Sequence, residues 1–137
     1  MAVIEELLRS EANGTISFGN HKLLEKRKVE NYEFAGDLYK VKTYNEITKL
    51  EKNGMFLYES VPGTSVLNLS ELETKMEFVV EGDKNAQITV GLKEDTEYEV
   101  FIDDMSAGTM KTGLSGKLSI SLELERSGEV PVRIVEK

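Results

Sequence analysis

The sequence predicts an all-β protein, an antiparallel β-sandwich or jelly-roll-like domain, and three observations support this. Apolar and polar residues alternate in short runs, which places the apolar ones on one face of a strand, whereas a helix would scatter them. Clusters of Gly, Asn, Asp and Ser separate about ten such runs at near-regular intervals. With 137 residues, 39% of them hydrophobic, the chain is large enough for one core, so we predict a single domain, 1–137.

The clearest alternation lies in residues 98–124. In its first part Tyr98, Val100 and Ile102 share one face. The second part has its apolar face formed by Leu118, Ile120, Leu122 and Leu124. We predict that these two runs are neighbouring strands of one antiparallel sheet, joined by a connector that contains glycines.

Further strands are predicted along the chain, at residues 15–18, 29–34, 38–44, 66–69, 75–81, 86–92 and 130–135. Asn53-Gly54 is the strongest short hairpin signal, since a type I′ turn needs positive φ at both central positions. That hairpin would place Leu50 opposite Leu57, although residues 45–50 could instead form one helical turn with Asn45 as its cap. Pro131 cannot donate a ladder hydrogen bond, which predicts that the last strand lies or begins at a sheet edge.

The N-terminal segment has two interpretations. Its apolar residues recur at helical spacing, which indicates a short amphipathic helix, although the same residues could pair as a strand. In either case the segment presents an apolar face that has to be buried, formed by Val3, Ile4, Leu7 and Leu8.

Composition limits the function classes. The formal net charge of −8 argues against nucleic acids and anionic membrane surfaces as partners, because both need clustered Lys and Arg. The chain has no cysteine, so disulfides and cysteine metal sites are excluded. Its first residues include two acids where a signal peptide needs bases, and no segment approaches the ~20 apolar residues of a membrane span. Read as a complete protein, the chain is expected to be soluble and cytoplasmic.

Two resemblances are carried by short motifs. The C-terminal pattern Y-E-V-F-I-D-D, G-T-M, G-K-L-S-I-S-L-E-L and V-P-V-R-I-V resembles β-sandwich modules appended to bacterial carbohydrate-active enzymes, which mostly support or bind. The motifs T-I-S-F-G-N, G-D-L-Y-K-V-K-T, N-G-M-F-L-Y-E-S-V-P-G-T and G-T-M-K-T are similar to a family of small acidic clostridial proteins that often carry the label endosialidase. Propeller sialidases bind the substrate carboxylate with clustered arginines, whereas the arginines of this chain are scattered, at Arg9, Arg27, Arg126 and Arg133.

No residue pattern points to catalysis. His21 is the only histidine, which favours an ordinary turn residue over a metal ligand or proton relay. There is no G-x-S-x-G or P-loop motif, and 25 acids offer many carboxylate pairs without a preferred one. Asp103-Asp104 could join a calcium site but lacks the D-x-D-x-D-G loop. We therefore predict no enzyme, no cofactor and no metal.

The aromatic side chains Tyr44, Tyr58 and Phe101 are predicted on or near solvent-exposed faces, where they could stack on sugars or anchor a subunit contact. The first hypothesis is a non-catalytic, self-associating structural or scaffold protein, a homo-oligomer whose N-terminal apolar segment adds to a neighbour's sheet edge. The alternative is a carbohydrate-binding module, and third comes a glycosidase-associated, endosialidase-like protein.

Overall fold

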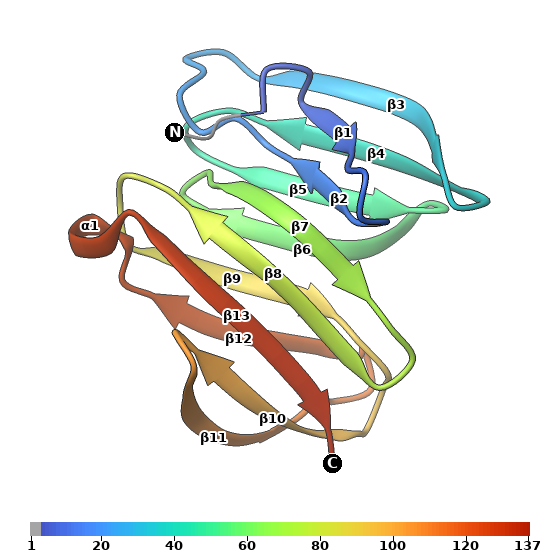
Figure 1. The fold of residues 1–137 in the computed structure, drawn as a ribbon, viewed down its shortest axis with the longest axis vertical. Helices are drawn as coiled ribbons and strands as arrows, with labels where there is room; N and C mark the ends of the chain where they lie inside the picture. Colours follow the sequence, from blue (N-terminus) through green and yellow to red (C-terminus); the bar gives the residue numbers. More distant parts are fainter. Residues whose placement is uncertain (1–3) are drawn as a thin grey trace.

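The computed structural model describes residues 4–137 and confirms the predicted fold class, because two antiparallel sheets pack face to face as a sandwich (Figure 1). The larger sheet contains, in spatial order, β1 (Leu8–Ser10), β2 (Ile16–Phe18), β7 (Ser65–Glu71), β8 (Lys75–Glu81), β13 (Glu129–Glu136), β10 (Glu97–Ile102) and β11 (Met105–Lys111). The smaller contains β12 (Lys117–Leu122), β9 (Ala86–Gly91), β6 (Met55–Val61), β5 (Thr48–Lys52), β4 (Asp37–Thr43) and β3 (Arg27–Phe34). One helix, α1 (Leu124–Ser127), follows β12.

The core lies between the two sheets and follows from period-two burial. Along β8 and β12, for example, every second side chain is buried, and the apolar residues occupy those positions. Tyr58 lies at the centre of the core, where its ring makes edge contacts with Phe18 at 5.2 Å and with Phe78 at 5.8 Å between centroids. Such T-shaped aromatic pairs add about 1 kcal/mol each beyond their buried area.

The two runs within residues 98–124 are strands, but the prediction that they are neighbours in one sheet is wrong. β10 belongs to the larger sheet and β12 to the smaller, and the supposed connector contains an additional strand, β11, that pairs with β10. The alternation was read correctly, since Tyr98 and Val100 are buried, as are Leu118, Ile120 and Leu122. The apolar faces of the two strands belong to opposite sheets, and Leu124 starts α1 instead of extending β12.

The edge position predicted for the last strand is also wrong, because β13 lies inside the larger sheet between β8 and β10. The carbonyl of Pro131 accepts a hydrogen bond from the N–H of Asp103, just beyond the end of β10. Because the N–H and C=O of a strand residue point to the same neighbour, the missing N–H of Pro131 also faces the place where β10 has already ended. The proline therefore removes no ladder hydrogen bond.

The N-terminal segment forms no helix in its described part. Leu7 has a positive φ of 72°, which interrupts helical geometry, and Leu8 begins strand β1, which pairs with β2. The strand interpretation is therefore the correct one from Leu8 onward. Within residues 4–137, no helix is long and apolar enough to cross a membrane.

The hairpin predicted at Asn53-Gly54 is confirmed, and it joins β5 to β6. Both turn residues have positive φ, at 54° and 79°, as a type I′ turn requires. The register differs from the prediction, because a bulge between Leu50 and Glu51 places Tyr58, and not Leu57, opposite Leu50. The bulge turns the Tyr58 ring into the core.

Candidate functional site

Of the three aromatic residues predicted to be exposed, Tyr58 contradicts the prediction, because it is fully buried. Its hydroxyl lies 2.8 Å from Oγ1 of Thr64, within a buried hydrogen-bonded cluster of hydroxyl groups. Burial raises the pKa of Tyr58, so the phenol stays neutral and hydrogen-bonded. The strand bulge that shifts the β5–β6 register explains the error, and Tyr58 cannot contact a ligand or a subunit.

Tyr44 and Phe101 are half-buried and each is engaged within the chain. The hydroxyl of Tyr44 donates to Oε1 of Glu46 at 3.1 Å, and this hydrogen bond raises the pKa of Tyr44. The Phe101 ring lies 4.2 Å from the guanidinium carbon of Arg133, which covers one of its faces. Tyr44 directly follows β4 of the smaller sheet, whereas Phe101 belongs to β10 of the larger sheet.

The N-terminal residues predicted as a subunit contact pack into the core of their own chain. Ile4, Leu7 and Leu8 are at most 5% exposed, whereas Val3 lies outside the described residues. The N–H of Ile4 donates to the carbonyl of Gly19, and the N–H of Gly19 donates to the carbonyl of Leu7. The segment is thus tied into its own fold.

His21 lies in a turn, as predicted, and its side chain is buried. Its Nδ1 lies 2.8 Å from Oγ of Ser65, and its Nε2 lies 3.8 Å from a carboxylate oxygen of Asp83, which also pairs with Lys22. Burial lowers the pKa of His21 and the charge of Asp83 opposes this less strongly, so the imidazole is neutral at pH 7. Ser65 is itself completely buried, so this Ser-His-Asp contact joins three segments and exposes no nucleophile.

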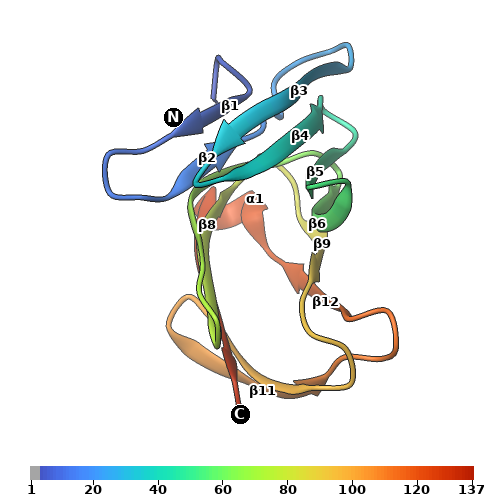
Figure 2. The ribbon, with the colours of Figure 1, turned by 90° about the vertical axis from the view of Figure 1, so that its right-hand side faces the viewer.

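One end of the sandwich contains a pocket with a volume of about 500 Å³. It lies among the turns that join β5 to β6, β7 to β8, β9 to β10 and β11 to β12, the end that faces the viewer in Figure 2. Met55 and Leu72 at this pocket are 71% and 58% exposed, and the ammonium of Lys117 lies 4.5 Å from the centroid of the Phe56 ring. The pocket has the size of a small-ligand site.

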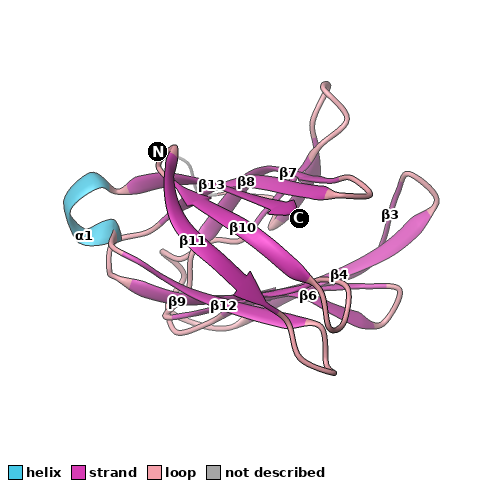
Figure 3. Cartoon of the chain, turned by 90° about the horizontal axis from the view of Figure 1, so that it is seen from below, coloured by secondary structure: helices cyan, strands magenta, loops and turns pink. Residues whose placement is uncertain are grey.

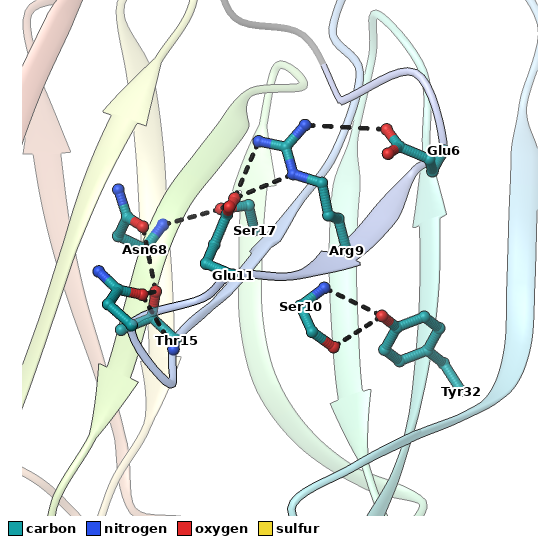
Figure 4. A network of polar contacts seen from close by, with 9 residues as sticks. Glu6, Arg9, Ser10, Glu11, Thr15, Ser17, Tyr32 and Asn68 are labelled. Atoms are coloured by element: carbon teal, nitrogen blue, oxygen red, sulfur yellow. Dashed lines mark hydrogen bonds and ion pairs between the residues drawn. The ribbon is translucent and has the colours of Figure 1, made fainter.

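The edge strands of the two sheets differ between the two sides of the sandwich, and those on one side carry many charges. These strands are β1 and β3. Arg9 of β1 pairs with Glu6 and Glu11, and Tyr32 of β3 accepts a hydrogen bond from the N–H of Ser10 at 2.9 Å (Figure 4). The β3 strand carries a bulge and four charged residues, which are Arg27, Lys28, Glu30 and Glu33. Charges and bulges are the usual protection of an edge strand against pairing with another chain.

On the second side, the strand β12 lacks most of this protection. The edge strands of this side are β11 and β12, whose sequences are M-S-A-G-T-M-K and K-L-S-I-S-L, so each has one lysine, at a strand end, and no other charge. β11 is irregular, with a bulge opposite Val100 and Phe101 and a φ of 102° at Gly108. β12 is regular, because its six residues pair with β9 without any register shift.

The direction in which the N–H and C=O groups of β12 point follows from a hydrogen bond just before the strand. In this bond the N–H of Leu92, just beyond the end of β9, donates to the carbonyl of Gly116. Hydrogen-bonding groups alternate between the two sides of a strand. Even-numbered residues of β12 therefore bond to β9, while the N–H and C=O groups of Ser119 and Ser121 point to the free edge. Both serines are exposed. The edge is a row of backbone donors and acceptors that another strand can pair with.

Neither the arrangement of the described residues nor comparison with known proteins assigns a metal or ligand site. Among residues 4–137, no group of three or more His, Cys, Asp or Glu side chains is placed to hold a metal ion. No family model, no curated protein and no solved structure matches the chain.

Proposed function

We propose that this chain is a non-catalytic structural protein that assembles from copies of itself through the side of the sandwich formed by β11 and β12. The observation that supports the proposal is the contrast between the two sides. On one side β3 carries four charged residues and a bulge, whereas on the other side β11 and β12 carry one lysine each, and β12 is regular. In a chain with 31% charged residues, an edge with so little charge supports an interface at this place, since an unprotected edge pairs readily with another strand.

The solution mass of the purified protein tests this proposal. We expect light scattering and sedimentation velocity to give a discrete species at a multiple of 15.4 kDa, with dissociation on dilution. A single species of 15.4 kDa over the whole accessible concentration range would contradict it.

A second candidate, carbohydrate binding, is favoured by the pocket at the end of the sandwich. The Phe56 ring, held by Lys117, and the exposed Met55 and Leu72 provide an apolar surface next to polar groups, as sugar recognition requires. A glycan array tests this candidate, with binding expected for the wild type and loss expected for Phe56→Ala. An array without signal would remove it.

A further inference from the structure

We infer that β12 pairs antiparallel with the β12 strand of a second copy, about a two-fold axis at Ile120, so that the smaller sheets of both copies form one continuous sheet. This inference rests on the proposed self-association and names its contact. A two-fold contact uses the same strand on both copies, so the strand has to be complementary to itself.

The sequence of β12 and the residue after it has this property. Residues 117–123 read K-L-S-I-S-L-E, which is symmetric in residue type about Ile120. In antiparallel pairing centred there, Leu118 lies opposite Leu122 of the second copy and Ser119 lies opposite its Ser121. The only charged positions, Lys117 and Glu123, also lie opposite each other, and they carry opposite charges. Glu123 still has extended backbone angles, with φ −96° and ψ 99°, so the strand geometry reaches this residue.

The backbone fits the same register. The groups that point to the free edge belong to the odd-numbered residues, so the Ser119–Ser121 pairs are the ones that exchange two N–H···O=C bonds. Ile120 then lies in a non-hydrogen-bonded pair on the axis, where Cα atoms approach to about 4.5 Å. Its side chain and those of Leu118 and Leu122 point inward and are buried, so the contact would join the two hydrophobic cores.

The free edge of β12 is accessible to a second strand. Within residues 4–137, β9 is the one strand that pairs with β12. In Figure 3, β11 crosses β12 near the loop that joins them and diverges from the remaining length of β12. Between Lys117 and Glu123 the outer face of β12 is polar but uncharged, since Ser119 hydrogen-bonds Thr89 and Ser121 hydrogen-bonds Gln87. No like charges therefore oppose one another across the axis.

The Lys117–Glu123 pair sets the register more than the affinity. Lys117 now lies over the Phe56 ring, so pairing with the Glu123 of a second copy exchanges one weak contact for another. Opposite charges at both ends of the strand nevertheless favour this register over a shifted or parallel arrangement, in which like charges or unpaired charges would result.

A proline at Ser121 tests the backbone contact. Ser121→Pro removes an N–H that faces the free edge and leaves the bonds to β9 intact, whereas Ser121→Ala removes the same side-chain hydrogen bond to Gln87 and keeps the N–H. Because of the two-fold symmetry, the dimer loses one hydrogen bond from each copy. We therefore expect the dimer dissociation constant of Ser121→Pro to be at least about tenfold higher than that of Ser121→Ala. Circular dichroism and thermal unfolding verify that both variants fold.

A charge exchange tests the register without a proline. Lys117→Glu places glutamates opposite each other at both ends of the contact, and Glu123→Lys does the same with lysines. We expect each single variant to weaken the dimer and the double variant K117E/E123K to restore it, as measured by sedimentation. Recovery of the dimer in the double variant requires a contact in which residue 117 of one copy lies next to residue 123 of the other.

A cysteine on the axis tests the symmetry. The chain has no cysteine, so Ile120→Cys introduces a single thiol that would face its own copy within disulfide range. Ser119→Cys is the matched control, because residue 119 lies diagonally from its own copy, at about 7–8 Å, beyond that range. We expect oxidation to cross-link Ile120→Cys and to leave Ser119→Cys largely monomeric on a denaturing gel.

The outcomes separate this inference from the proposed function. If the wild type assembles but the proline and charge variants assemble equally well, the β12 contact is overturned and self-association stands. If the wild type remains at 15.4 kDa, the proposed function is overturned, and the β12 edge is left for an extended segment of another protein.

Discussion

The imidazole of His21 joins three segments that are distant in the sequence, and its burial makes their contact sensitive to pH. The loop that precedes β3, the first residue of β7 and the turn between β8 and β9 meet at this side chain. Because the pKa of His21 in the folded protein lies below its ordinary value of about 6.5, the unfolded chain binds the proton more readily. Stability is therefore highest above about pH 6.5 and falls as the pH decreases toward the lowered pKa.

We predict that the melting temperature decreases from neutral pH to about pH 5 more in the wild type than in His21→Gln. Glutamine can keep a hydrogen bond to Ser65 but does not titrate. Partial burial raises the pKa of Glu81, which shifts stability in the opposite sense, and the comparison cancels this effect because both proteins contain Glu81. Equal pH dependences of the two melting temperatures would show that His21 is not the titrating group.

At the scale of elements, the β5–β6 hairpin is fastened to the start of β4 by one side chain. Asn53 accepts a hydrogen bond from the N–H of Leu38 and donates one to the carboxylate of Asp37, both at 2.9 Å. The residue also occupies the left-handed region, with φ 54°, which asparagine tolerates better than most residues.

We predict that Asn53→Ala lowers the free energy of unfolding by about 2 kcal/mol, from two lost hydrogen bonds and an unfavourable φ. Asn53→Gly keeps the turn conformation and loses only the hydrogen bonds, so its loss should be about half as large. Urea denaturation of both variants measures the contribution of the hydrogen bonds and that of the positive φ at residue 53. Equal decreases in the free energy of unfolding would show that the positive φ has no effect.

The strands and their buried faces could be predicted from the sequence because alternation is local. The runs at 75–81 and 86–92 were placed within a residue of β8 and β9. The sheet to which each strand belongs could not be predicted, since the β10 and β12 patterns are equally compatible with one sheet or with two. Bulges shift the register by one residue and were not visible either, which is why Tyr58 was expected at the surface.

The strand proposed as the contact, β12, was not among the residues predicted for self-association. The self-association hypothesis placed the contact on the apolar N-terminal segment, because exposed apolar residues are the usual signal of an interface. That segment is part of the core, from which Ile4, Leu7 and Leu8 cannot be withdrawn without cost. The symmetric stretch K-L-S-I-S-L-E was readable in the sequence, but its meaning depends on β12 being an edge strand, which only the sheet order reveals.

At the scale of the whole molecule, the N-terminal segment covers the core beside β2. We predict that deletion of residues 1–8 removes roughly 6 kcal/mol of stability, because Ile4, Leu7 and Leu8 are buried and each contributes about 2 kcal/mol. This is comparable with the total stability of a small domain, so the truncated chain should melt at a much lower temperature or fail to fold. Thermal unfolding followed by circular dichroism measures this, and an unchanged melting temperature would contradict the placement of these residues in the core.

The unequal protection of the two sides also determines how far an assembly could grow. When two copies share their smaller sheets through β12, the outermost strand at each end of the combined sheet is β3. That strand carries four charged residues and a bulge, so it offers no continuation to a third copy. A smaller sheet with one edge that can pair and one that cannot would stop at a dimer, whereas two pairing edges would permit an open-ended fibril.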